Sequence, residues 1–177
     1  MKHSVYLILT LLLIIGCRPD EARRPLTNNS GTVINASIKR NKTLNEAEYT
    51  RIQALINSSE KRIYTSENGF WYFYNSQLKS ENKTPKFGDQ VYFTYNVKNL
   101  NKELIYSKKE LSPQSYYIDQ QELFSGLREG LKLMKENETI TFIFPSHKAY
   151  GYYGDNNLIG RNTPIICEVS LLKHQIN

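Results

Sequence analysis

Apolar and polar residues alternate without interruption from Val91 to Lys98. Successive side chains of a β-strand point to opposite faces, so a period of two separates the larger side chains from the more polar ones. An antiparallel sheet with one buried face produces this pattern. The segment therefore predicts a half-buried antiparallel strand. Its apolar face would carry Val91, Phe93, Tyr95 and Val97, and its other face Tyr92, Thr94, Asn96 and Lys98.

Further strands and one helix are expected around this strand. Apolar residues recur at helical spacing from Gln120 to Lys135, although Gly126 and Gly130 lie among them. A glycine inside a helix costs about 1 kcal/mol relative to alanine, so we expect a sheet or a ligand to approach closely. A loop at 145–163 is unusually long, which favours a functional role. The remaining expected strands are two around a turn at 67–69, then Leu104–Ser107, Tyr116–Ile118, Glu138–Phe144 and Pro164–Leu172.

An additional helix is expected before this domain. Thr43 and Glu46 have the spacing of a capping box, and apolar residues then follow one helical face to about Ser58. We expect a helix over 43–60 that packs on its own sheet, and a flexible tether of polar composition over 17–42. The predicted fold class is α+β. An antiparallel sheet over 62–177 would wrap around one short α-helix, with this extra N-terminal helix in front.

The N-terminal segment has the features of an export signal. Its apolar run, residues 5–15, would span about 17 Å as a helix, whereas a bilayer core is about 30 Å thick. Residues 1–16 are therefore predicted to be a signal peptide. The sequence Ile14-Ile15-Gly16-Cys17 resembles a bacterial lipobox, which implies acylation of Cys17 and membrane attachment in the cell envelope. Arg18, in place of the Asp of inner-membrane lipoproteins, favours the outer membrane, facing the periplasm. An ordinary secretory signal with an incidental cysteine is the alternative.

Charge and side-chain chemistry exclude several classes of function. The formal net charge is +6, but the lysines are spread along the chain among acidic residues, whereas nucleic-acid binding would cluster them on one element. His147 and His174 have no cysteine or carboxylate at metal-ligand spacing, so we expect no metal and no cofactor. With Cys17 acylated, Cys167 is the one cysteine left, and it is predicted to be a buried, inert thiol. We expect a monomer.

Several motifs occur in a fixed order along the second half of the chain. They are Gly88-Asp89 before the alternating strand, Gly126-Leu127-Arg128-Glu129-Gly130-Leu131 in the helix, Ala149-Tyr150-Gly151 with Gly154 in the loop, and Val169-Ser170-Leu171-Leu172 at the end. This succession resembles the FKBP family of peptidyl-prolyl cis-trans isomerases. The resemblance covers roughly residues 62–174. It implies an FKBP-like fold and isomerisation of X–Pro bonds in protein or peptide clients.

The resemblance also implies which residues form the pocket. The Tyr150 hydroxyl would bond a substrate carbonyl, the backbone N–H of Phe124 would hold another, and Leu127 would form the pocket floor. The catalytic positions are Tyr150, Phe124, Leu127 and Tyr95. The substrate-binding positions are Ile105, Tyr106, Leu123, Ile159 and Cys167.

Three positions depart from the family's pattern. Tyr106 replaces a pocket Asp, Gln114 replaces an aromatic residue, and Cys167 replaces a Phe. These changes remove a polar partner and enlarge or soften part of the pocket, which weakens the expected activity. A folding catalyst for exported proteins is the first hypothesis, and a non-catalytic FKBP-like binding or chaperone module of a motility or secretion machinery is the alternative. With its lipobox and extra helix, the chain most resembles the gliding-motility-associated FKBP-type lipoproteins of Bacteroidetes.

Overall fold

A computed structural model describes residues 30–79 and 83–177. The chain divides into two units at Lys39, so the described residues 30–38 fall in the first unit and residues 39–79 and 83–177 in the second. The predicted signal peptide, Cys17 and the first part of the predicted tether lie outside the described residues. The second unit holds the whole sheet and the core. Within the described residues, no helix is both long and apolar enough to cross a membrane.

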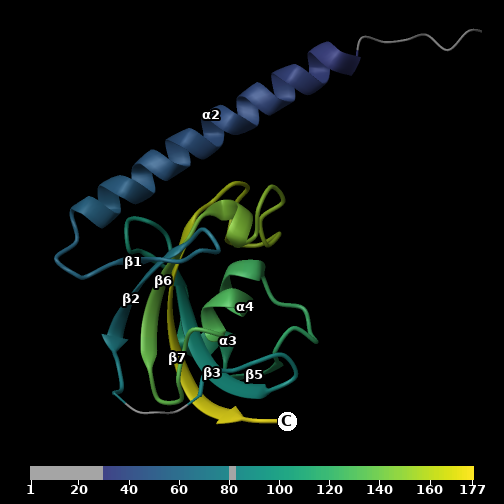
Figure 1. Ribbon diagram of the computed structural model, residues 1–177. Coiled ribbons are helices and arrows are strands. Elements are labelled where there is room, and N and C mark those ends of the chain that lie inside the picture. The colour runs from purple at the N-terminus through teal and green to yellow at the C-terminus, as the bar shows by residue number, and fades with distance from the viewer. Residues whose placement is uncertain (1–29, 80–82) are drawn as a thin grey trace, which may run out of the picture. The chain divides into compact units, whose positions relative to one another are not determined.

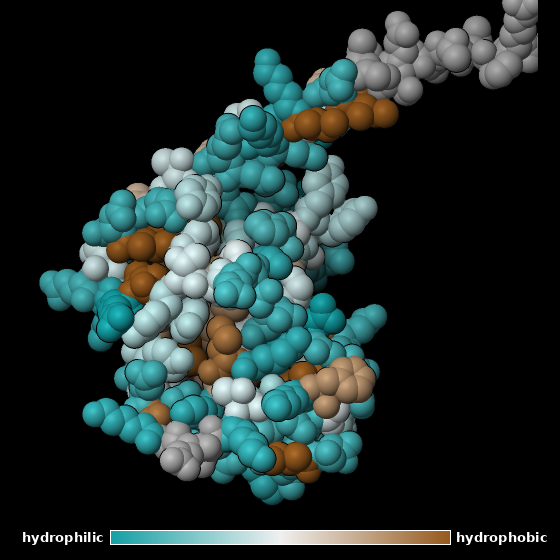
Figure 2. Space-filling view, viewed as in Figure 1, coloured by the Kyte–Doolittle hydropathy of each residue, from teal (hydrophilic) through white to brown (hydrophobic). Residues whose placement is uncertain are grey.

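A seven-stranded antiparallel sheet forms the second unit and curves around the short helix α4 (Ser125–Leu131), as Figure 1 shows. Its strands run in the spatial order β1-β2-β6-β7-β3-β4, and β5 pairs with β3. This architecture confirms the predicted α+β fold. Hydrophilic residues predominate on the face seen in Figure 2, where hydrophobic residues form small, separate patches. The strands are β1 (Tyr64–Thr65), β2 (Trp71–Ser76), β3 (Gln90–Lys98), β4 (Leu104–Tyr106), β5 (Gln114–Tyr117), β6 (Thr139–Phe144) and β7 (Ile165–Gln175).

Strand β3 confirms the prediction from its alternating side chains. Every second residue is buried and the residues between are half-buried, so the period of two is followed along the whole strand. Strand β7 pairs with β3 on one side and with β6 on the other. The buried face of β3 joins Leu127 and Leu131 of α4 and Phe142 of β6 in the main core.

Helix α4 is shorter than the predicted helix over Gln120–Lys135. Phe124 has extended backbone angles (φ −62°, ψ 143°), so the helix begins only after it. Beyond Leu131 the chain continues in tight turns, with Met134 N donating to Leu131 O at 3.2 Å. Those turns bury Met134 completely. The apolar spacing that suggested a longer helix is therefore satisfied by turns that pack the same side chains into the core.

The two glycines of α4 lie against aromatic rings of β6, as their position in a helix had suggested. A Cβ atom on Gly126 would lie 2.5 Å from Cδ1 of Phe144 and 2.8 Å from the carbonyl oxygen of Lys148. A Cβ atom on Gly130 would lie 3.0 Å from the ring of Phe142. The glycines let the helix approach the sheet, and they make no direct room for a ligand.

Helix α2 (Ser30–Asn57) begins thirteen residues before the predicted start at Thr43, so the prediction of a tether is wrong for residues 30–42. These residues contain no proline that would stop a helix. Thr43 is not a cap, because its hydroxyl donates to the Lys39 carbonyl at 3.1 Å, one helical turn back. Threonine makes such bonds inside helices. The spacing of Thr43 and Glu46 was therefore a coincidence.

A true capping box occurs at Ser107, before the four-residue helix α3 (Lys108–Leu111), an element that the sequence analysis did not predict. The part of α2 beyond Lys39 packs on the outer face of the sheet, the face away from α4. There Ile52 is fully buried with Trp71, Ile143 and Ile166 in a second apolar cluster. This contact confirms that the N-terminal helix packs on its own sheet.

Candidate active site

The structure brings all nine predicted pocket residues into one apolar cluster on the α4 side of the sheet. They come from β3, β4, β7, helix α4 with the two residues before it, and the long loop after β6. The cluster divides by exposure. The buried members are Tyr95, Leu127, Ile159 and Cys167, and the half-buried members are Ile105, Tyr106, Leu123, Phe124 and Tyr150.

The half-buried residues form the surface that a ligand can reach. Leu123, Phe124 and Tyr150 line a shallow depression at the start of α4, together with Glu122 and Arg128. The rings of Phe124 and Tyr150 lie 5.2 Å apart between centroids. A second contact joins Phe124 edge-on to Phe144 in the core, at 5.5 Å. The depression therefore presents an aromatic surface whose side chains are supported from beneath.

The buried residues support this surface from the core side. Leu127 and Cys167 have no exposed surface, and Ile159 has 2%. A ligand therefore meets none of them directly in this conformation, although the family resemblance places them in the pocket lining. Cys167, in place of a larger residue, is closely packed within the core cluster.

Two tyrosine hydroxyls meet at the centre of the cluster. Burial, the nearby Cys167 and a partly offsetting hydrogen bond with the Tyr150 hydroxyl together raise the pKa of Tyr95 to about 12. Burial, followed by the effect of Tyr95, also raises the pKa of Tyr150. Both hydroxyls consequently keep their protons at neutral pH. The hydrogen bond between them lowers the pKa of Tyr95, so Tyr150 is its donor, and a client carbonyl in the depression would have to replace the Tyr95 oxygen as the acceptor of the Tyr150 proton.

Sequence reasoning missed Asp155, which is bonded to Tyr106. The Tyr106 hydroxyl donates to Oδ2 of Asp155 at 2.5 Å and accepts from Asn157 Nδ2 at 3.0 Å. The other carboxylate oxygen accepts the backbone N–H groups of Asn157 and Ile159 at 2.9 and 2.8 Å. Burial opposes ionisation of Asp155, but these hydrogen bonds lower its pKa overall. An Asp followed by two Asn residues is a local turn signal, yet it does not indicate Tyr106 as the partner.

Glu48 of α2 is the second residue that sequence reasoning missed. This residue is 4% exposed, and its carboxylate accepts the backbone N–H and the hydroxyl of Ser146 at 2.5 and 2.7 Å. The carbonyl of Ser146 in turn accepts the N–H groups of Ala149 and Gly151 at 3.0 and 2.8 Å. Tyr150 lies between these two residues. The N-terminal helix therefore fixes the start of the loop that carries Tyr150.

No three His, Cys, Asp or Glu side chains in residues 30–79 and 83–177 lie close enough together to hold a metal ion. His174, predicted not to be a ligand, instead pairs with Asp89 through Nε2 at 2.8 Å. This pair is buried and joins the end of β7 to the start of β3.

Sequence comparison identifies the relatives of this chain. A profile of the family described as "FKBP-type peptidyl-prolyl cis-trans isomerase" matches residues 81–172. A protein of Neisseria meningitidis serogroup B, named "Probable FKBP-type peptidyl-prolyl cis-trans isomerase FkpA", is 29% identical over 118 residues. That match covers 66% of this chain and 42% of the Neisseria protein. The chain thus spans less than half the length of this relative.

Two crystal structures share the fold. One is a peptidyl-prolyl cis-trans isomerase from Pseudomonas syringae, with a TM-score of 0.62 and 20% identity over 76% of this chain and 96% of that one. The other is FkpA from Escherichia coli, with a TM-score of 0.62 and 21% identity over 97% of this chain and 82% of that one. At these identities the likeness establishes the fold alone.

Proposed function

This chain belongs to the family of FKBP-type peptidyl-prolyl cis-trans isomerases, and on that premise we propose that it catalyses rotation about X–Pro bonds in exported proteins. One observation supports this more than any other. Phe124 and the protonated Tyr150 hydroxyl meet in one aromatic depression at the start of α4. That depression joins an apolar surface to a hydrogen-bond donor.

The reaction needs no more than such a surface. Rotating a peptide bond crosses a barrier of about 18–20 kcal/mol because amide resonance is lost, but no covalent bond breaks. A twisted amide is less polar than a planar one, so an apolar surface that excludes water destabilises the planar form relative to the transition state. A donor placed toward the carbonyl of the twisted form stabilises it further.

The residues divide their roles according to exposure. Leu123, Phe124 and Tyr150 would contact the proline and its carbonyl, and Ile105 and Tyr106 would contact flanking parts of the client. The buried Tyr95, Leu127, Ile159 and Cys167 would hold these side chains in place. Prolyl isomerisation takes tens to hundreds of seconds without a catalyst, so it can limit the folding of an exported protein.

The test compares the full chain with two site variants on a short peptide that contains one proline. We expect Phe124→Asp to lower kcat/KM about tenfold or more, which corresponds to about 1.4 kcal/mol of lost transition-state stabilisation. Tyr150→Phe should lower kcat/KM less. Tyr153→Phe should leave it unchanged, because Tyr153 is 76% exposed. A folded parent chain without activity, or a Phe124→Asp variant as active as the parent, would refute the proposal.

A non-catalytic binding module is the second candidate, and burial favours it. Tyr95, Leu127 and Cys167 are buried, so the reachable surface is shallower than a deep ligand pocket. A shallow aromatic surface can hold a segment of a partner protein of a motility or secretion machinery without turnover. Peptide binding that is lost in Phe124→Asp, with no acceleration of isomerisation by the parent, would select this candidate.

We also propose, from the N-terminal sequence, that Cys17 is lipidated and anchors the chain in the cell envelope, at the outer membrane. Mass spectrometry of the purified protein should find acyl chains on Cys17, and Cys17→Ala should release the protein from the membrane fraction. The link to gliding motility rests on resemblance and would be tested by the spreading of a deletion strain. The expected monomer and the expected absence of nucleic-acid binding stay predictions.

A further inference from the structure

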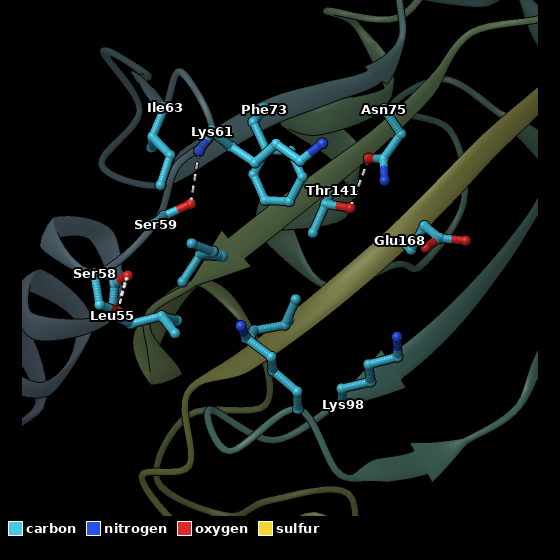
Figure 3. Close-up of a pocket in the computed structure, with 13 residues that line it drawn as sticks. Leu55, Ser58, Ser59, Lys61, Ile63, Phe73, Asn75, Lys98, Thr141 and Glu168 are labelled. Carbon is cyan, nitrogen blue, oxygen red and sulfur yellow. Dashed lines mark hydrogen bonds between the residues drawn. The ribbon is translucent and has the colours of Figure 1, made fainter.

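A separate cavity of about 320 Å³ lies on the outer face of the sheet, beside the C-terminal end of α2 (Figure 3). Its walls come from α2, the segment after it, and strands β2, β3, β6 and β7. None of the nine predicted pocket residues lines it. A cavity of this size lies at the lower end of the range of small-ligand sites.

The floor of the cavity is apolar. Ile143 and Ile166, which are 2% and 7% exposed, continue the cluster that packs α2 on the sheet. Leu55, Ile63 and Phe73 extend this apolar surface toward solvent. Helix α2 therefore covers only part of the outer face, and the uncovered part keeps a hydrophobic floor.

The rim of the cavity is positively charged. Lys61, Lys98 and Lys102 line it, and Figure 3 shows Lys61 and Lys98 on opposite sides. Among the described residues, none of the three forms an ion pair. Glu168 is the one acidic residue in the lining, and its carboxylate is already paired with Lys108 at 2.8 Å.

The uncharged part of the cavity wall offers a hydrogen-bond donor to a ligand. The Thr141 hydroxyl donates to Oδ1 of Asn75 at 2.7 Å, which orients the Asn75 side chain and leaves its amide nitrogen for another acceptor. A ligand for this cavity should therefore have an apolar body and one small, negatively charged acceptor group. A phosphate or a sugar would leave the floor unused, and a neutral alkane would leave the lysines unpaired.

We propose that this cavity binds an aliphatic monocarboxylate of medium chain length. The chain lies on Ile143, Ile166 and Phe73, and the carboxylate pairs with the ammonium group of a lysine at the rim, Lys61 or Lys98. This site is independent of the isomerase site, since its residues come from the opposite face of the sheet. The carboxylate would therefore bind in this cavity whether or not the chain is an active isomerase.

The test titrates the full chain with decanoate and follows the backbone amide signals by NMR. We expect signals of Phe73, Thr141 and Ile166 to shift with a saturable, submillimolar dissociation constant. Decanol, which has the chain without the charge, and acetate, which has the charge without the chain, should each bind at least tenfold more weakly. Shifts confined to Leu123, Phe124 and Tyr150, or equal affinity for decanoate and decanol, would overturn the proposal.

A matched pair of variants separates charge from folding. The double variant Lys61→Met/Lys98→Met should weaken decanoate binding at least tenfold and leave decanol binding unchanged or tighter, because the apolar floor is intact. Lys109→Met, on the exposed surface of α3, should bind decanoate like the parent. Unchanged decanoate binding in the double variant would also overturn the proposal. The isomerase assay on the same samples reports independently, because none of these residues lies at the predicted active site.

Discussion

At the residue scale, the hydrogen bond between Tyr106 and Asp155 places a carboxylate next to the position at which the family resemblance leads one to expect an Asp. The resemblance places Tyr106 where the family carries a pocket Asp. In the structure its hydroxyl donates to Asp155, which belongs to the long loop. The negative charge of Asp155 also contributes to the raised pKa of Tyr150, the proposed donor. The pair joins β4 to the loop and holds an ionised group beside the depression.

The Tyr106–Asp155 bond should contribute measurably to stability. Tyr106→Phe and Asp155→Asn should each lower the free energy of unfolding by about 1–3 kcal/mol, since hydrogen bonds to charged groups are worth that much. The double variant should lose little more than either single variant, because both remove the same bond. Urea unfolding of the four proteins measures this coupling. Strictly additive losses would show that the two side chains act separately.

The buried pair of Asp89 and His174 predicts a dependence of stability on acid pH. Burial alone would raise the pKa of Asp89, but hydrogen bonds from His174 and from the N–H groups of Lys86 and Asn177 lower it overall. A lowered pKa in the folded state stabilises the fold above the unfolded pKa of about 3.9, and this contribution is lost as pH falls through the folded pKa.

Asp89→Asn should therefore be less stable than the parent by about 1–3 kcal/mol at pH 6. The difference should narrow as pH falls below the unfolded pKa of about 3.9, because the stabilisation from the ionised Asp89 is lost between that pKa and the lower folded one. Thermal unfolding of both proteins between pH 3 and pH 6 checks this. A stability difference between the two proteins that stays constant across that range would contradict the lowered pKa of Asp89.

At the element scale, local patterns predicted the strands better than the helix ends. The alternation in β3 depends only on neighbouring residues, so it could be recognised without knowledge of the partner strands. The limits of α4 depend on how Met134 and Phe124 pack, which the apolar spacing alone does not reveal. The start of α2 was placed too late because Thr43 and Glu46 imitate a cap, although Thr43 bonds back to Lys39 inside the helix.

The close approach of α4 to β6 predicts unequal effects at its two glycines. Gly126→Ala should destabilise the protein by about 1–3 kcal/mol, because the new methyl group meets both the Phe144 ring and the backbone at Lys148. Gly130→Ala should be nearly neutral, because a milder contact with Phe142 is offset by a gain in helix propensity of about 1 kcal/mol. Chemical unfolding of both variants measures the two effects. Equal losses of unfolding free energy would contradict the closer contact at Gly126.

The bond between α2 and the long loop predicts that a helix residue controls the order of the Tyr150 segment. Glu48→Ala leaves the Ser146 N–H buried without its acceptor and should cost about 1–3 kcal/mol. Hydrogen exchange at Ala149 and Gly151 should become faster, because both amides bond to the Ser146 carbonyl.

Two control variants accompany Glu48→Ala. Glu48→Gln keeps one acceptor oxygen, so it should lose less unfolding free energy and show a smaller rise in exchange rate than Glu48→Ala. Glu46→Ala, at a side chain that is 65% exposed, should resemble the parent. If the amides of Ala149 and Gly151 exchange in Glu48→Ala at the same rate as in the parent, other contacts hold the loop.

At the scale of the whole molecule, the sequence motifs indicated which residues would meet, and the structure supplied the bonds among them. All nine predicted pocket residues share one cluster because the motifs lie on strands and loops whose order the family resemblance fixes. Asp155 lies 49 residues from Tyr106, and Glu48 lies 98 residues from Ser146. No local pattern indicates partners at such separations. The burial of Cys167 confirms the predicted buried thiol, whereas the apolar Leu127 fits a core and a pocket equally well, so the sequence could not show that no ligand would reach it.

The two faces of the sheet therefore carry different chemistry. The α4 face holds the aromatic depression with a protonated tyrosine, and the outer face holds a lysine-rimmed apolar cavity. Strand β7 contributes Cys167 to the first face and Ile166 to the second, because neighbouring residues of a strand point to opposite faces. One sheet thus separates a proposed catalytic surface from a proposed ligand site.

The central claim, that the depression at Phe124 and Tyr150 is an isomerase site, is tested most directly by NMR exchange spectroscopy on a proline peptide with the full chain present. The account predicts cross-peaks between the cis and trans forms that build up within a second, whereas the uncatalysed interconversion takes tens of seconds or longer. The amide signals of Leu123, Phe124 and Tyr150 should shift in the same sample. Absent cross-peaks from a folded protein, or cross-peaks with shifts confined to other surfaces, would contradict it.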